Sequence, residues 1–336
     1  MKTGITLYSA TNEWVTGTYD LEGLLAAVAE RELGPGVEIV GFQTIPTFPD
    51  VSDDFVRDWD RLVAKYDLVP TCVGSNIDVA QRSDRLLSDD EMVASLERQL
   101  ATASKLGFGI VRIQIGANEA VIERVVPTAE RLGLKLGMEL HAPEGAHTPA
   151  ILKVRDAYDR IDSSVLGFIP DFSATMRAVP PGELADLAAL GLPSAWVDRL
   201  VAEWAGEGAP FERFGRFAAA AGAAGVPKEA IDAATMVFTM HGREPVDSWR
   251  ELVGRIVHVH GKCYGFDEAG DEPSIDYAAI IGLLDDLGYD GWISTEWEGH
   301  AFTGPGEVDS LDLVAAQQAL VRRVLTDRRA SPGGED

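Results

Sequence analysis

The sequence predicts an α/β protein folded as a (β/α)8 TIM barrel, on three observations. Eight short apolar runs, each typical of a buried strand, recur along the 336 residues, and amphipathic segments lie between them. Strand–helix alternation indicates parallel strands joined by helical crossovers. A doubly wound sheet is the alternative, but no G-x-G-x-x-G motif follows the first run, and eight regular units favour a closed barrel.

The expected strands are short and rich in β-branched residues. In chain order they occupy residues 4–10, 37–42, 69–75, 110–116, 135–141, 165–172, 256–262 and 291–298. Apolar residues recur at helical spacing between them, most clearly from Met92 to Ala103 and from Ile280 to Leu287. These elements predict one barrel domain over residues 1–328, followed by a polar, disordered tail at 329–336.

One connection interrupts the repeat. Residues 174–246, between the sixth and seventh expected strands, contain short Ala-rich helical stretches separated by Pro and Gly. This insertion follows the C-terminal end of a strand, so we expect it over the face where barrel enzymes bind substrates. It could be a lid, a substrate wall or a subunit contact, or it could be inert. Its aromatic residues could line a wall but suit the insert's own core better: Trp196, Trp204, Phe211 and Phe214.

Composition excludes several function classes. The net charge of −25, from 54 acidic and 29 basic residues, repels phosphate backbones and anionic lipids, so nucleic-acid and membrane binding are not expected. Two cysteines are too few for a disulfide framework or a thiolate zinc site. The N-terminal residues lack the apolar run of a secretory signal, and no segment is long enough to span a membrane. We therefore expect a cytoplasmic protein.

The last four strands predict a metal site. Because residues i and i+2 of a strand share a face, their polar faces must point into the barrel. These faces bring four side chains to the C-terminal mouth: Glu139, Asp171, His260 and Glu296. Three carboxylates left alone there would repel one another and lose hydration. A divalent cation resolves that conflict, and three oxygens with one imidazole suit Mn²⁺, Mg²⁺ or Co²⁺ better than zinc.

The same strands supply candidates for proton transfer next to a carbonyl. A metal that holds a ketone and its adjacent hydroxyl stabilises the enediolate formed when the α-proton leaves. His141 is the first candidate for the base or acid, because imidazole titrates near neutrality; alternatively it positions a carboxylate. Lys262 could polarise a substrate oxygen or pair with a carboxylate, and Glu298 is the second candidate base. His258, one layer deeper, is expected to be a hydrogen-bonded core residue.

Further polar residues lie at or near the ends of the first four strands and just after the eighth. They could hydrogen-bond sugar hydroxyls, or they could equally satisfy the barrel interior. They are Tyr8, Gln43, Asn76, Arg112, Gln114 and His300. The mouth therefore has enough donors and acceptors for a polyhydroxylated ligand.

The stretches "GMELH", "IPDFS", "VHVHGK" and "WISTEWE" resemble the metal-binding strand ends of the xylose-isomerase-like superfamily, often labelled sugar phosphate isomerase/epimerase. The resemblance covers nearly the whole chain except the insert. It implies one divalent metal, often manganese, held by Glu139, Asp171, His260 and Glu296.

A narrower resemblance concerns the activity. Small-sugar epimerases of this kind have a much shorter Asp-to-His connection, and their usual Glu after the histidine is replaced in "HGKCY". The long insert, "TLYSATNEW" and "ELHAP" instead resemble the catalytic α subunit of bacterial C-glycoside deglycosidases. That resemblance implies a lyase-type reaction on 3-oxo-glucosides of plant polyphenols, in which an enolate forms and the aglycone is eliminated. It also implies a small β subunit as partner.

Other function classes stay open. A metal-dependent ketose isomerase or epimerase is the alternative enzyme, because the same enediolate can be reprotonated instead of losing a leaving group. A non-catalytic sugar-binding barrel would not need four converging metal ligands. A DNA-repair endonuclease with this barrel would need more metal-binding histidines and a basic surface.

Overall fold

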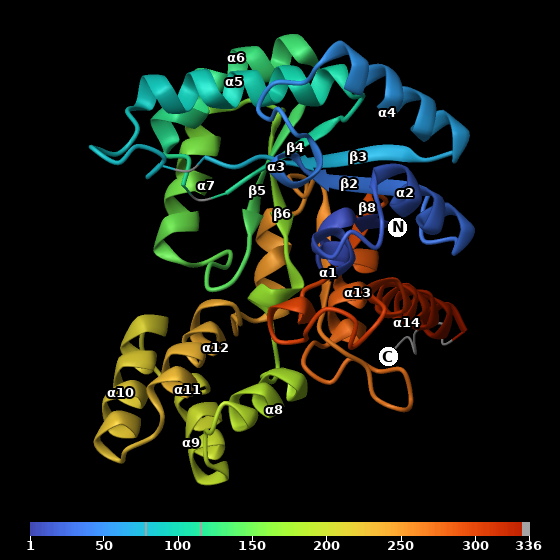
Figure 1. Cartoon of the computed structure of the whole chain (residues 1–336). Helices are drawn as coiled ribbons and strands as arrows, with labels where there is room; N and C mark the ends of the chain where they lie inside the picture. The colour runs from blue at the N-terminus through green and yellow to red at the C-terminus, as the bar shows by residue number, and fades with distance from the viewer. Residues whose placement is uncertain (78, 115, 331–336) are drawn as a thin grey trace, which may run out of the picture.

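The computed structural model describes residues 1–77, 79–114 and 116–330, and eight parallel strands form its centre (Figure 1). The strands are β1 (Lys2–Thr6), β2 (Gly36–Val40), β3 (Val69–Gly74), β4 (Ile110–Ile113), β5 (Lys135–Leu140), β6 (Leu166–Pro170), β7 (Val259–Cys263) and β8 (Trp292–Trp297). They pair in the order β6-β5-β4-β3-β2-β1-β8-β7. Parallel bridges from Phe168 to Ile256 and from Asp171 to His260 bring the two outer strands together. The predicted (β/α)8 barrel is therefore confirmed.

Helices cover the outside of the barrel. The longer ones are α2 (Leu21–Glu30), α4 (Asp53–Lys65), α5 (Asp89–Lys105), α6 (Glu119–Leu132), α7 (Pro149–Ile161), α13 (Tyr277–Asp286) and α14 (Ser310–Ala330). Several begin at a side chain that accepts a hydrogen bond from the first turn: Asp20, Ser52, Ser88 and Asn118. Short turns lie at strand ends: η1 (Leu7–Ala10), α1 (Thr11–Val15), α3 (Gly41–Thr44), η2 (Phe172–Ala174), η3 (Val246–Leu252) and η4 (Gly299–Ala301).

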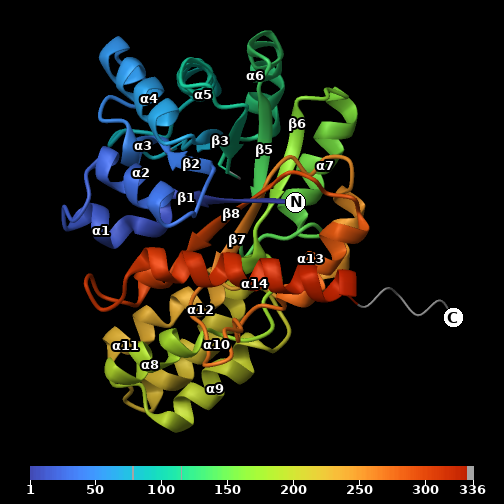
Figure 2. The same ribbon diagram turned by 90° about the vertical axis from the view of Figure 1, so that its right-hand side faces the viewer.

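Between β6 and β7 the chain forms α8 (Pro181–Ala189), α9 (Ser194–Trp204), α10 (Pro210–Ala223), α11 (Lys228–Ala233) and α12 (Thr235–Thr239). These helices gather at one end of the molecule, away from α4, α5 and α6 (Figures 1 and 2). Aromatic residues pack among them, with ring centroids 6.0 Å apart for Trp196 and Phe217 and 5.8 Å apart for Phe214 and Phe238. Trp204 is also buried, whereas Phe211 is exposed.

Several boundaries differ from the sequence-based expectation. Residues 7–10, expected in the first strand, form η1, because the Thr6 side chain accepts a hydrogen bond from the Tyr8 backbone and ends the extended conformation. Residues 41 and 42, expected in the second strand, begin α3. Arg329 and Ala330, expected in the tail, end α14, while residues 331–336 and Ile115 of the fourth expected strand lie outside the described residues. Within the described part of the chain, every helix is too short or too polar to cross a membrane.

Candidate metal centre

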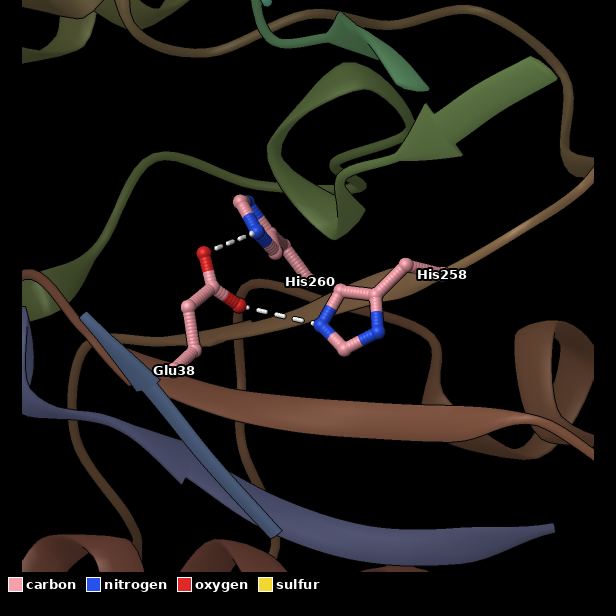
Figure 3. A group of neighbouring side chains, drawn as sticks. All are labelled: Glu38, His258 and His260. Carbon is pink, nitrogen blue, oxygen red and sulfur yellow. Dashed lines mark hydrogen bonds and ion pairs between the residues drawn. The ribbon is translucent and has the colours of Figure 1, made fainter. Parts of the chain in front are cut away.

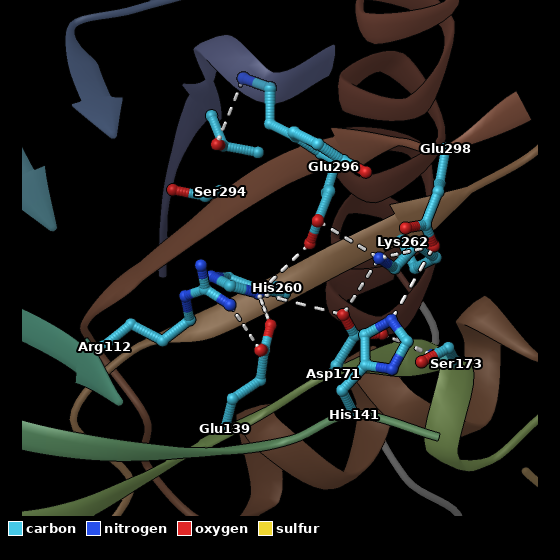
Figure 4. Close-up of polar contacts among 12 residues, drawn as sticks. Arg112, Glu139, His141, Asp171, Ser173, His260, Lys262, Ser294, Glu296 and Glu298 are labelled. Carbon is cyan, nitrogen blue, oxygen red and sulfur yellow. Dashed lines mark hydrogen bonds and ion pairs between the residues drawn. The ribbon is translucent and has the colours of Figure 1, made fainter. Parts of the chain in front are cut away.

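The C-terminal ends of β5 to β8 bring the four expected metal ligands to one point (Figure 4). One potential ligand atom from each of Glu139, Asp171, His260 and Glu296 lies within 4.8 Å of the others, and all four residues are buried. Nδ1 of His260 faces all three carboxylates, at 2.7 Å from Glu139 Oε1, 3.1 Å from Glu296 Oε2 and 3.7 Å from Asp171 Oδ2. The tertiary structure thus assembles the set that strand alternation predicted.

The donor set fits a single divalent cation. The oxygens Asp171 Oδ2 and Glu296 Oε2 are buried and make no hydrogen bond of suitable geometry to the described residues, although Lys262 Nζ lies 3.3 Å from the first and His260 Nδ1 lies 3.1 Å from the second. A buried carboxylate oxygen without a partner is costly unless a positive charge compensates it. Three carboxylates and one imidazole are ligands that Mn²⁺, Mg²⁺, Co²⁺ and Zn²⁺ accept. These residues could therefore hold one metal ion.

Two of the carboxylates are held in their ionised form. Burial raises the pKa of Glu139, but the charges of Arg112 and His260 outweigh it, so this pKa lies well below the usual value. Arg112 Nη1 is 2.6 Å from Glu139 Oε2. Burial likewise raises the pKa of Asp171, but Lys262 and His260 reverse the shift and leave it lowered. Both side chains can therefore accept a cation without first losing a proton.

Glu38 of β2 contacts His260 and His258 through its two carboxylate oxygens (Figure 3). Its Oε1 is 3.0 Å from His260 Nε2, and its Oε2 is 3.0 Å from His258 Nε2. A carboxylate oxygen accepts hydrogen bonds, so Nε2 of His260 carries a hydrogen, and Nδ1 is the nitrogen that would face a cation bound among the three carboxylates. His258 is fully buried and also lies 2.9 Å from Ser294 Oγ, which matches the core role expected for it.

Glu38 was not among the residues predicted from the sequence. Its only local signal is a single acidic residue within the apolar run "VEIVGF", and isolated acidic residues in strands also occur at exposed positions. β2 is far from β7 in the sequence, and β1 and β8 lie between them in the sheet. Only the closed barrel therefore brings the Glu38 carboxylate to the two histidines.

Lys262 is fully buried among carboxylates. Its Nζ lies 3.3 Å from Asp171 Oδ2, 3.1 Å from Glu296 Oε1 and 2.9 Å from Glu298 Oε2. Burial lowers the pKa of this ammonium group, but the three carboxylates outweigh burial and raise it well above the usual value. Of the two roles considered for Lys262, the geometry favours pairing with carboxylates.

His141 follows β5 and lies beside Glu298. Its Nδ1 is 2.7 Å from the Ala142 carbonyl oxygen, which can only accept, so Nδ1 carries a hydrogen. Its Nε2 is 3.7 Å from Glu298 Oε2. Burial and Lys262 lower the pKa of His141, but Glu298 and Asp171 outweigh them and raise it to about 9. A divalent cation in the carboxylate cluster would oppose that rise, and Nε2 is the atom at which the ring exchanges a proton.

Two cavities open at this mouth and share Gln114, Glu139 and His141. The second cavity is also lined by Tyr8, Val40, Phe42, Asn76, Arg112, Met240, Glu296 and Glu298. Four of the expected substrate contacts, Tyr8, Asn76, Arg112 and Gln114, therefore border the space next to the candidate metal site. Gln43 Nε2 instead donates to Thr11 Oγ1 at 3.1 Å. The His300 ring packs edge-on against the Tyr8 ring, with the two ring centroids 4.8 Å apart.

A family model described as "Xylose isomerase-like TIM barrel" matches residues 29–322. The chain belongs to the xylose isomerase-like TIM barrel family. Among its relatives is a C-glycoside deglycosidase alpha subunit from Arthrobacter globiformis, 40% identical over 325 residues that cover 96% of this chain and 92% of the relative. A 3'-dehydrocarminate deglycosidase alpha subunit from a Microbacterium species is 37% identical over 342 residues, which cover 98% of this chain and 97% of the relative.

Solved structures share the fold at low sequence identity. The structure of an L-ribulose 3-epimerase has a TM-score of 0.56 and 15% identity, covering 98% of this chain and 97% of that one. The IOLI protein, solved with a zinc atom, has a TM-score of 0.57 and 12% identity, and the match covers 97% of this chain and 99% of that one. These similarities show the barrel alone, whereas the deglycosidase subunits match in sequence along nearly their whole length.

Proposed function

We propose that this chain is the catalytic α subunit of a C-glycoside deglycosidase, a metal-dependent lyase-type enzyme that acts on 3-oxo-glucosides of plant polyphenols. One observation carries the proposal: the buried cluster of three carboxylates and one imidazole adjoins a cavity that His141 also lines. The deglycosidase names of relatives at 37–40% identity support the enzymatic role and its substrate class.

The candidate ligands Glu139, Asp171, His260 and Glu296 would hold one divalent cation, for which we propose Mn²⁺. A cation held there would supply positive charge to the ketone oxygen of a 3-oxo sugar. Arg112 and Glu38 keep Glu139 and His260 in place for that purpose, through contacts of 2.6 Å and 3.0 Å. Tyr8, Asn76 and Gln114 would bind sugar hydroxyls in the same cavity, and Gln43 and His300 would hold the neighbouring Thr11 and Tyr8.

His141 would move the proton. In its neutral form Nε2 takes the proton from C2 of the sugar, which the C3 ketone acidifies. The resulting enolate forms the C1–C2 double bond as the bond from C1 to the aglycone breaks, and that electron pair leaves with the aglycone. The aglycone carbon then takes the proton back from Nε2. The proton that His141 takes from C2 is therefore the one that it returns to the aglycone, and no further reactant is needed.

Glu298 and Lys262 would stabilise the two states of His141. Glu298 Oε2, 3.7 Å from His141 Nε2 and 2.9 Å from Lys262 Nζ, accepts from the ring while it carries the extra proton. Lys262 balances the negative charge of the surrounding carboxylates, so that the carboxylates keep their positions before and after proton transfer. The relatives are named alpha subunits, and we propose a small β subunit as the partner of this chain as well.

Turnover tests the proposal directly. Mn²⁺-loaded protein, with and without a candidate β subunit, is given aryl C- and O-linked 3-oxo-glucosides beside free ketoses, and products are separated by chromatography. We expect release of the aglycone, and a loss of kcat of at least about 100-fold in His141→Gln. His147→Gln, at an exposed histidine, is the matched control and should keep activity. Isomerised or epimerised ketose without aglycone release would establish the alternative enzyme instead.

A further inference from the structure

A short stem joins the helical insert to the barrel directly after Asp171. Residues 173–176 run antiparallel to residues 240–244, with an antiparallel bridge from Thr175 to Arg243. Three backbone hydrogen bonds hold the stem: Gly242 N to Ser173 O at 2.7 Å, Met176 N to Gly242 O at 2.9 Å and Glu244 N to Ala174 O at 3.0 Å. The Ser173 backbone N–H also donates to Asp171 Oδ1 at 2.6 Å. The stem is thus tied to a candidate metal ligand.

His241, within the stem, is held from three sides. Its Nε2 contacts the Glu183 carboxylate of α8, and its Nδ1 lies 3.3 Å from the Tyr264 hydroxyl. Its backbone oxygen accepts from Trp204 Nε1 of α9 at 3.0 Å. All four residues are buried. Because Glu183 accepts from Nε2, Nδ1 is free to accept from Tyr264, so a single arrangement of hydrogens satisfies the whole chain of contacts.

Met240 precedes this fixed residue and lines the second cavity at the mouth. Among the described residues of the insert, Met240 alone lines the cavity that also contains Glu139, His141 and Glu296. A thioether packs well against aromatic rings and adapts to their shape. The four aromatic residues that the sequence offered as possible walls do not line this cavity. The contribution of the insert to the site therefore comes from one adaptable apolar side chain.

We infer that Met240 is a specificity-determining residue that contacts the aromatic, non-sugar part of the substrate. We further infer that the Glu183–His241–Tyr264 chain is the positioning device that holds Met240 over the cavity. The substrate class in this inference rests on the proposed function. The contact itself rests on the stem, on the fixing of His241 and on the place of Met240 in the cavity wall.

Ligand binding without turnover tests the role of Met240. Phenyl β-glucoside and methyl β-glucoside lack the ketone, so they bind without reacting, and calorimetry on Mn²⁺-loaded protein gives their Kd values. We expect the wild type to bind the phenyl compound about 10-fold more tightly, and Met240→Ala to reduce that ratio to about 2-fold. Met240→Leu should keep most of the preference. Met236→Ala, one turn earlier in α12 and outside the cavity lining, should not change it.

The positioning device is tested by Tyr264→Phe, which removes one hydroxyl and leaves the ring. We expect the phenyl-to-methyl ratio to fall to between 3-fold and 5-fold while the affinity for methyl β-glucoside stays close to wild type. An unchanged ratio in Tyr264→Phe would overturn the positioning role. An unchanged ratio in Met240→Ala, or no phenyl preference in the wild type, would overturn the contact. Failure of the proposed function is separate, because it shows as no aglycone release from 3-oxo-glucosides while the phenyl preference persists.

Discussion

At the scale of single residues, both ring nitrogens of His260 face carboxylates. His260 presents Nδ1 to three carboxylates, while Nε2 donates to Glu38. A histidine ligand needs such a partner, because the hydrogen bond fixes both the tautomer and the direction of the ring. Glu38 is therefore as much a part of the candidate site as the four residues that would contact the cation.

Replacing Glu38 with Gln should weaken metal binding. The neutral amide no longer compensates the two histidines, and it can present an N–H to a ring nitrogen that already carries hydrogen. We expect the affinity for Mn²⁺ to fall about 10- to 100-fold, measured by competition with a chelator. Glu272→Gln is the control, since Glu272 is a buried carboxyl that accepts backbone N–H groups outside the cluster. Equal Mn²⁺ affinity in Glu38→Gln and wild type would refute this role.

At the scale of elements, the stem shows how an insertion of five helices is attached without disturbing the site. Both of its segments are short; the first follows β6 directly, and the second leads through η3 to β7. Gly242 allows this, because a Cβ there would lie 2.6 Å from the Ala174 carbonyl oxygen. A backbone that approaches so closely leaves no room for a side chain.

Gly242→Ala should therefore loosen the stem. We expect a loss of about 1–3 kcal/mol in the free energy of unfolding, measured by urea denaturation, because backbone atoms rather than a flexible side chain must move. Gly222→Ala in α10 is the matched control, because a Cβ at that position meets nothing within 4 Å. The control should be neutral or more stable by about 0.5–1 kcal/mol. If Gly242→Ala were as stable as the control, the close approach would have no structural cost.

At the scale of the whole molecule, the site lies where the first and last strands of the pairing order, β6 and β7, meet. Closure between β6 and β7 brings Asp171 to His260, and β8 adds Glu296 beside them. The cluster concentrates negative charge in a buried region of a chain that already carries a net charge of −25. Repulsion within the cluster opposes folding, so a bound cation should stabilise the entire barrel.

Metal binding should accordingly raise the melting temperature. At a free Mn²⁺ concentration about 100-fold above Kd, a ligand that binds only the folded state adds about 2.7 kcal/mol. We expect a rise of about 5 °C in circular dichroism melts relative to protein in excess chelator. Asp171→Asn, which removes one carboxylate charge from the cluster, should lose most of this difference. Identical melting curves with chelator and with Mn²⁺ would contradict a metal site here.

The barrel, the position of the insert and the four candidate ligands could all be predicted from the amino-acid sequence. These follow from local properties: the period of two along a strand and the rule that parallel strands end at one mouth. Strand ends were less predictable, because the side chain of Thr6 and the turn after Val40 stop the extended backbone inside apolar runs.

The residues that support and complete the candidate site could not be predicted, because they come together only in the folded barrel. Glu38 meets His260 across 222 positions of the chain, and Met240 reaches the cavity because the stem and three buried partners hold its neighbour. No local pattern encodes such contacts, since each depends on where two distant backbones pass one another. The same holds for Lys262, whose three carboxylate partners come from β8 and from the residues that follow β6 and β8, and meet it only in the folded barrel.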